Sequence, residues 1–161
     1  MMIKRILLTI ITITLMATIF WFSSQPADES TEISNEVGYI IGRIFVPGFN
    51  QLSPEEQYNY ADSIDFYVRK SAHASEYLLL GVLMALTLYS WFLECPYLVF
   101  LMGWLATTLY AESDEIHQLF VQGRACMLRD VGIDAAGAVL GILLLAIIHH
   151  LNNKKKKAHE F

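Results

Sequence analysis

Four long apolar stretches constrain this chain more than any other feature of its sequence. They occupy residues 6–22, 74–93, 96–111 and 131–148. A helix of about 17–20 residues covers about 25–30 Å, which is close to the thickness of the hydrocarbon core of a bilayer. Only helices are plausible there, because lipid offers no partners for open backbone groups. The third stretch is the shortest and needs its flanks to complete a span. The sequence predicts an all-α fold, a four-helix transmembrane bundle in one domain covering residues 1–161.

Aromatic residues mark the ends of these stretches. Trp21 and Phe22 close the first, Tyr89 and Trp91 close the second, and Tyr97 opens the third. Amphipathic rings prefer the depth of the lipid headgroups, so these positions indicate membrane interfaces.

The distribution of basic residues predicts the orientation. Six basic residues lie near the two termini, before the first stretch or after the fourth, namely Lys4, Arg5 and the run Lys154 to Lys157. Both termini are therefore expected in the cytoplasm, with residues 152–161 as a basic tail, and an even number of spans satisfies that requirement. The connection at residues 94–96 then lies on the cytoplasmic side of the membrane, and the two longer connections lie on its outer side. Those outer connections contain five basic residues, namely Arg43, Arg69, Lys70, Arg124 and Arg129.

The first stretch also has features of a secretion signal, since Lys4 and Arg5 precede an apolar run. Its exit at residues 20–24, however, lacks small residues at the spacing that cleavage requires. We therefore expect it to remain as a membrane helix of a multi-pass protein in the plasma membrane.

The first outer connection, residues 23–69, is too long to be a structureless loop in a compact protein. Apolar residues between Ile33 and Phe45 recur at helical spacing, which predicts an amphipathic helix along the membrane surface or over the bundle. Pro47 and Gly48 end that helix. Ser53 and Glu56 then form the pattern of a capping box that begins a second short helix.

Composition limits the classes of function and cofactor. No basic stripe is interleaved with exposed aromatic residues, so nucleic acid is not an expected partner. Cys95 and Cys126 show neither metal-type nor redox-type spacing and are expected to be unpaired thiols. Gly137 and Gly141 form a G-x-x-x-G pattern whose expected role is close helix packing. The sequence indicates no cofactor.

Charged and polar residues gather at the outer ends of the second, third and fourth stretches. A charge at the bilayer centre costs about 2.5–3.5 kcal/mol on insertion scales, so such a concentration carries information. Lys70, His73 and Tyr77 share one helix face, with Glu76 adjacent. Taken alone, this group also fits a simple interfacial role in which Lys70 extends toward the headgroups.

A second group follows the third stretch. If that helix continues, Glu112, Glu115 and Gln118 line one face, and Asp114 and His117 line another. Three acids within four residues repel one another unless cations approach. The candidate cations come from other segments, namely Lys70, His73, Arg124 and Arg129. A structural charge network and a ligand site both fit this pattern.

The third group lies at the start of the fourth stretch. A turn is expected at Gly123, next to Arg124, and Asp130 fits an N-cap at the positive end of the helix dipole. Asp134 lies one turn deeper on the same face. A buried carboxylate there needs a partner, and an arginine is the expected one.

Together these motifs resemble one family. Residues 69–81 (RKSAHASEYLLLG), 114–124 (DEIHQLFVQGR) and 130–137 (DVGIDAAG) are similar in order and spacing to the VanZ-like membrane proteins, as is Ser23-Ser24-Gln25-Pro26. The resemblance covers about residues 5–148. Gln122 departs from it, because a proline is common before the Gly-Arg pair. The residues that match the family signature are Lys70, His73, Glu115, Gln118, Arg124, Asp130 and Asp134.

The resemblance implies a role at the bacterial cell envelope, since the family is named after a member associated with resistance to the glycopeptide teicoplanin. One hypothesis is a protein that binds or modifies a lipid-linked or cell-wall component, or the antibiotic, with arginines holding phosphate or carboxylate groups. A second is an enzyme on a lipid-linked phosphate, with His73 as base and Glu115 as orienting acid. A third is a purely structural role. A metal version, with the pairs His73/Glu76 and Asp114/His117, is a minor alternative.

Overall fold

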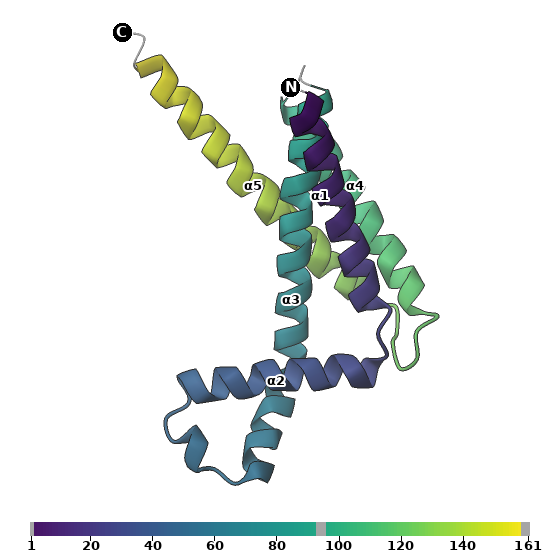
Figure 1. Cartoon of the computed structure of the whole chain (residues 1–161), viewed down its shortest axis with the longest axis vertical. Helices are drawn as coiled ribbons and strands as arrows, with labels where there is room; N and C mark the ends of the chain where they lie inside the picture. The colour runs from purple at the N-terminus through teal and green to yellow at the C-terminus, as the bar shows by residue number, and fades with distance from the viewer. Residues whose placement is uncertain (1, 93–95, 159–161) are drawn as a thin grey trace.

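The computed structural model describes residues 2–92 and 96–158, and it is helical throughout (Figure 1). Its elements are α1 (Met2–Ser23), α2 (Ala27–Phe45), a short 3₁₀ helix η1 (Phe49–Gln51), α3 (Pro54–Trp91), α4 (Pro96–Gln118) and α5 (Leu128–Ala158). Over these residues there is no strand, so the all-α prediction is confirmed. Glu94 and Cys95, part of the connection expected inside, lie outside the described residues.

The helices form an elongated group with one element set across it. In Figure 1, α1, α3 and α4 run side by side, and α5 crosses α3 and diverges from it toward its end. Helix α2 lies across α3 at the opposite end of the molecule from the start of α1. The start of α1 and the last turns of α5 lie toward the same end, as an even number of antiparallel passes requires.

Three helices are long and apolar enough to cross a membrane: α1, α3 and residues 128–152 of α5. Helix α4 does not meet the same standard, because its apolar run is short and acids begin at Glu112. Length and composition therefore support three of the four predicted membrane spans. All four helices nevertheless pack together, with α3 contacting each of the others.

Helix α3 differs from the expectation of a short helix followed by a separate span at residues 74–93. It is one continuous helix of 38 residues, half of which precedes the apolar stretch. The predicted capping box at its start is present: the Ser53 side chain accepts from the Glu56 backbone, and the Glu56 carboxylate accepts from the Ser53 backbone at 2.8 Å. Between Pro54 and Gly81 no glycine or proline interrupts the helix, so the change from polar to apolar composition marks no break.

Small residues let α3 and α5 approach closely. Gly137 faces the backbone of Ala74, and Gly141 faces the backbone of Leu78. A Cβ atom at either glycine would overlap a carbonyl oxygen of α3. The predicted packing role of the G-x-x-x-G pattern is confirmed, and its partner is α3 of the same chain.

A buried cluster fixes α1 against α3 and α4 near the level of the polar groups. It contains Ile19, Tyr77 and Ala111, each at most 1% exposed. The Tyr110 hydroxyl donates a hydrogen bond of 2.6 Å to the backbone carbonyl of Met16. This packing brings the last turn of α1 beside the last turn of α4.

Helix α2 confirms the predicted amphipathic helix, but the face that it buries is small and polar. Gly38 lies against Ala61 of α3, and Ser34 donates a hydrogen bond to Asp65. Its large apolar side chains are exposed instead, namely Ile33, Val37, Ile40, Ile44 and Phe45. Because this stripe has no protein cover among the described residues, it suits contact with lipid.

Candidate functional site

The polar groups of four segments meet where α1 and α4 end and α5 begins, beside the middle of α3. The connection from α4 to α5 turns at Gly123, where φ is +74°, a backbone conformation that favours glycine. The Ala27 backbone N–H donates a 3.1 Å hydrogen bond to the Gln122 carbonyl, which holds this connection against the start of α2. The turn predicted at Gly123 is confirmed.

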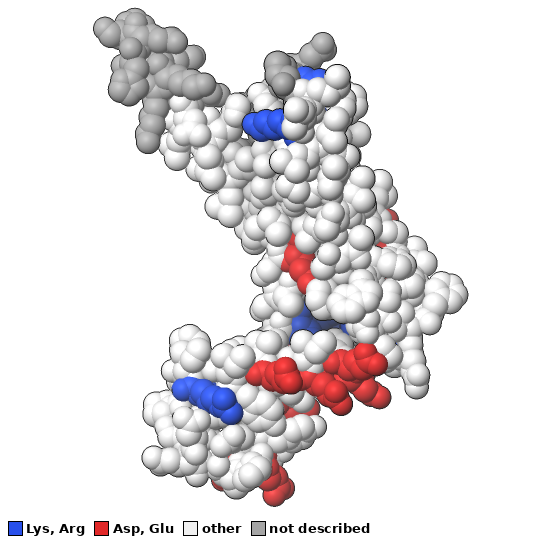
Figure 2. Space-filling model, in the orientation of Figure 1, with Lys and Arg blue, Asp and Glu red and all other residues white. Residues whose placement is uncertain are grey.

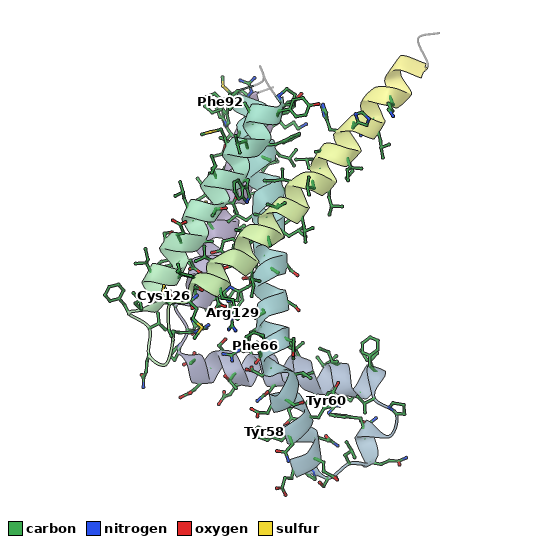
Figure 3. The ribbon with its side chains drawn as sticks, turned by 180° about the vertical axis from the view of Figure 1, so that it is seen from behind. Tyr58, Tyr60, Phe66, Phe92, Cys126 and Arg129 are labelled. Carbon is green, nitrogen blue, oxygen red and sulfur yellow. The ribbon has the colours of Figure 1, made fainter. Side chains whose placement is uncertain are left out.

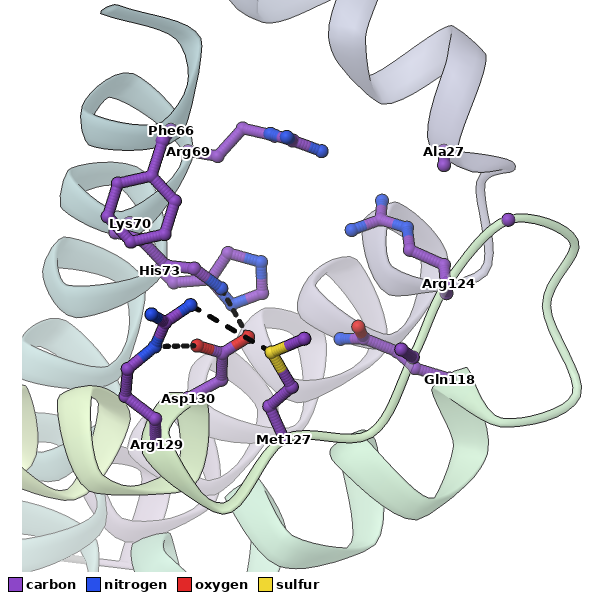
Figure 4. Close-up of a pocket in the computed structure, with 12 residues that line it drawn as sticks. Ala27, Phe66, Arg69, Lys70, His73, Gln118, Arg124, Met127, Arg129 and Asp130 are labelled. Carbon is purple, nitrogen blue, oxygen red and sulfur yellow. Dashed lines mark hydrogen bonds and ion pairs between the residues drawn. The ribbon is translucent and has the colours of Figure 1, made fainter.

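These segments enclose a cavity of about 230 Å³ (Figure 4). Its walls come from α3, the last turn of α4, the connection after α4 and the start of α5. The polar and charged residues that line it are Arg69, Lys70, His73, Gln118, Arg124, Arg129 and Asp130.

Arg124 lacks a carboxylate partner within this cavity. Its Nε donates a 3.2 Å hydrogen bond to the Gln25 carbonyl, and no carboxylate of the described residues lies within 4.0 Å of its guanidinium. Burial, together with the nearby positive charge of Arg69, lowers the pKa of the Arg124 guanidinium from its usual value. Arginine still stays charged at neutral pH. Figure 4 shows Arg69 and Arg124 extending into the same open space.

Arg69 is held in that position by α2 and α3 together. Its guanidinium pairs with Asp65, one helical turn earlier, and Asp65 also accepts the hydrogen bond from Ser34 of α2. The carboxylate therefore fixes both the arginine and the crossing of α2 over α3.

On the opposite wall, Asp130 joins α3 to α5. Its carboxylate pairs with the Lys70 ammonium, and Arg129 Nε lies 3.6 Å from its other oxygen. Arg129 also lies over the Phe66 ring, 5.0 Å from its centroid; both are labelled in Figure 3. The predicted N-cap role of Asp130 is wrong, because α5 begins two residues earlier at Leu128 and the carboxylate faces α3 instead.

His73 and Asp134 form the deepest pair. His73 Nδ1 lies 3.8 Å from Asp134 Oδ1, and Asp134 is 1% exposed. The expectation of an arginine partner for Asp134 is wrong: His73 of α3 takes that place, while Arg129 lies beside Asp130 and Arg124 donates a hydrogen bond to the Gln25 carbonyl. Neither oxygen of Asp134 has a hydrogen-bond partner among the described residues.

The acids at the end of α4 fix neighbouring segments. Glu115 is buried and accepts a 3.0 Å hydrogen bond from the Met127 backbone N–H. Asp114 accepts a 2.7 Å hydrogen bond from the Ser23 hydroxyl of α1, and Gln118 donates to the same oxygen at 3.5 Å. Helix α4 does continue through these residues, as the two-face pattern required. Glu115 thus orients the connection to α5, while the acid that faces His73 is Asp134.

A second hollow, also of about 230 Å³, opens between α1, α2 and α3. It shares Arg69, His73 and Arg124 with the first, and adds Ser23, Gln25 and Glu76. The two hollows together are called the basic chamber below. In Figure 2 basic atoms are recessed above α2, whose exposed side carries acids.

Five of the seven residues expected from the sequence line the first hollow: Lys70, His73, Gln118, Arg124 and Asp130. Glu115 and Asp134 lie buried behind it. The sequence-based set omitted Arg69, Gln25 and Asp114. Arg69 was detectable, because it lies four residues before His73 and so shares its helix face.

For the metal alternative, no group of three or more His, Cys, Asp or Glu side chains in the described part of the chain is arranged to hold a metal ion. Cys126 is a free thiol, and Cys95 lies outside the described residues.

Comparison with known proteins places this arrangement in a family. No curated protein and no solved structure matches the chain. The family model VanZ/LLP1 matches residues 8–149, which include α2, α3 and α4, most of α1 and α5, and every residue of the basic chamber. The chain therefore belongs to the VanZ/LLP1 family.

Proposed function

We propose that this protein binds the phosphate or carboxylate group of a lipid-linked or cell-wall component in the basic chamber, at the outer face of a bacterial plasma membrane. The observation that carries the proposal is Arg124: a half-buried guanidinium, without a carboxylate partner among the described residues, facing a cavity. Arginine binds phosphate and carboxylate through a planar pair of donors, and an anion between Arg69 and Arg124 would relieve their mutual repulsion.

The other charges support binding by fixing the walls. Asp130 and Glu115 each bind a cation or backbone group of a neighbouring segment, and Asp65 binds Arg69 of its own helix and Ser34 of α2. A site held in this way loses little conformational entropy when its ligand arrives. The acids therefore position the cations and leave Arg124 available to the ligand.

The membrane arrangement in this proposal has four crossings and both termini in the cytoplasm. The basic residues at the two ends of the chain support that orientation. Helix α4 crosses as part of the bundle, with its acidic last turn at the outer surface. The chamber then opens where lipid headgroups and cell-wall precursors are available.

Two consequences for the cell follow from a site of this kind. Occupying or modifying a lipid-linked precursor at the outer surface would change the access of antibiotics that bind the same precursors. We therefore expect the protein to lower susceptibility to glycopeptides or lipoglycopeptides such as teicoplanin.

An enzyme acting on a lipid-linked phosphate is the second candidate, and the pair of His73 and Asp134 favours it. A histidine beside a buried carboxylate, exposed to a cavity with arginines, has the arrangement of a general base with an orienting acid. In that case the protein would convert the bound compound to a product.

The test compares wild-type protein with Arg124→Lys, His73→Ala and Glu115→Gln in a glycopeptide-sensitive bacterial host. Membrane insertion and thermal stability are measured first, and teicoplanin susceptibility second. We expect Arg124→Lys to lose most of the protection at normal stability, because an ammonium cannot replace the two-pronged contact.

Each outcome separates the candidates. Normal protection in all three variants contradicts a site, and loss of stability in all three favours a purely structural role. Release of phosphate from lipid-linked phosphates by the purified protein, abolished by His73→Ala, would identify the enzyme.

A further inference from the structure

Next to the second hollow of the basic chamber lies an apolar groove that the proposed head-group site does not use. This groove lies in the angle between α2 and α3 and has a volume of about 580 Å³. Its lining is mostly apolar, with Val37 and Ile41 from α2 and Ile64, Tyr67 and Val68 from α3. Ala72 lines both the groove and the second hollow, so the two lie next to each other at that residue.

The lining changes from polar to apolar between the second hollow and the groove. Arg69, His73 and Arg124 line the second hollow together with the apolar residues Ile33 and Ala72. Ile33 is followed one helical turn later by Val37, which lines the groove. Ala72 and Ile33 are both exposed, so the boundary between the second hollow and the groove has accessible apolar side chains.

We infer that the ligand is an amphiphile with an anionic head group and at least one hydrocarbon chain, and that its chain lies in the groove between α2 and α3. The inference rests on the proposed function, because the anion site fixes where the head group lies. Charge places the head between Arg69 and Arg124, and the apolar walls beyond Ala72 suit a chain.

The orientation of α2 explains how such a ligand would arrive. Helix α2 buries small residues against α3 and leaves its large apolar residues on the open side. A helix of this kind lies in the membrane interface with that stripe in the acyl region. The groove in its angle with α3 is then open to lipid, and a ligand enters sideways from the bilayer.

The experiment uses the purified full chain in neutral detergent micelles, with two probes that share a phosphate head. Glycerol 3-phosphate has no hydrocarbon chain, and dioleoyl phosphatidate has two. Dissociation constants are measured for wild-type protein and for Ser71→Trp, which puts a large side chain in the groove at a residue that lines neither hollow of the chamber. A second variant, Val37→Asn, places a polar group on the α2 wall of the groove.

Ser63→Trp serves as the matched control, because Ser63 is an exposed serine on α3 that lines none of these hollows. We expect wild type and the control to bind phosphatidate at least about tenfold more tightly than glycerol 3-phosphate. In Ser71→Trp and Val37→Asn that preference should fall toward unity, while binding of glycerol 3-phosphate stays unchanged.

The contrary outcomes are separable. Unchanged phosphatidate binding in both groove variants overturns the inference and leaves the anion site standing. An equal loss of both probes in Ser71→Trp, or the same loss in Ser63→Trp, also overturns it, because the effect is then not specific to the hydrocarbon chain. Failure of wild type to bind either probe contradicts the proposed function itself.

Discussion

At the residue scale, the charged groups of the chamber differ in whether the protein itself neutralises them. Lys70 and Arg69 each have a carboxylate partner, whereas Arg124 has a backbone carbonyl. A paired cation is held by the fold, and its removal should act on stability. Substitution of a cation without a carboxylate partner among the described residues, such as Arg124, should mainly weaken ligand binding.

The pair of Lys70 and Asp130 gives a prediction about stability. Lys70→Met leaves Asp130, which is 8% exposed, with only the more distant Arg129. We expect the free energy of unfolding to fall by about 1–3 kcal/mol, because a largely buried carboxylate loses its partner. The double variant Lys70→Met/Asp130→Leu should recover much of that loss, since replacing both members of a buried pair removes the uncompensated charge.

Thermal denaturation of the two variants in detergent measures this effect. A double variant less stable than Lys70→Met alone would show that Asp130 supports the fold by contacts other than this pair. The matched comparison is Arg124→Gln, which should change the melting temperature little.

Sequence alone identified five of the seven polar or charged residues that line the first hollow, but few of their partners. Helical spacing placed Lys70 and His73 on one face of a helix. The three acids near the end of α4 indicated that cations from other segments approach that end. The partner of Asp134 was assigned to an arginine, and the structure gives His73. Such pairings depend on how two helices are rotated against each other, which local spacing does not determine.

At the element scale, the close contact of α3 with α5 holds two walls of the chamber together. The apolar cores of the helices and the start of α3 after the capping box at Ser53 were predictable from the sequence. The expected separate span at residues 74–93 is instead part of one helix that runs from Pro54 to Trp91, and α5 extends beyond the apolar stretch at both ends, from Leu128 to Ala158. A polar residue at the membrane surface ends the apolar stretch without ending the helix, so composition does not report these boundaries.

Two glycines of α5 give a matched test of this contact. A Cβ at Gly137 would overlap the Ala74 backbone, whereas one at Gly132 meets nothing within 4 Å. We expect Gly137→Ala to lower the free energy of unfolding by about 1–3 kcal/mol through overpacking. Gly132→Ala should leave it unchanged or raise it by up to about 1 kcal/mol, because alanine favours a helix.

Melting temperatures of the purified proteins check both values. An equal change in melting temperature for the two variants would mean that α3 and α5 are not in close contact at Gly137.

At the scale of the whole molecule, the helices bring residues far apart in the chain to one end of the bundle. Gln25, His73 and Arg124 come from three separate segments and meet around one chamber. The sequence predicted this convergence from topology: consecutive antiparallel helices return alternate connections to the same side. The crossing of α2 over α3 and the groove between them were not predictable, because they depend on contacts between small residues such as Gly38 and Ala61.

The most direct test of a chamber at the outer face uses the two native cysteines. Cys126 lies in the connection between Arg124 and α5 and is partly exposed, whereas Cys95 lies in the connection predicted to be cytoplasmic. Cells expressing either single-cysteine variant, Cys95→Ala or Cys126→Ala, are treated intact with a thiol reagent that does not cross membranes. We predict labelling of Cys126 in intact cells and of Cys95 only after permeabilisation; the reverse pattern would contradict an outward-facing chamber.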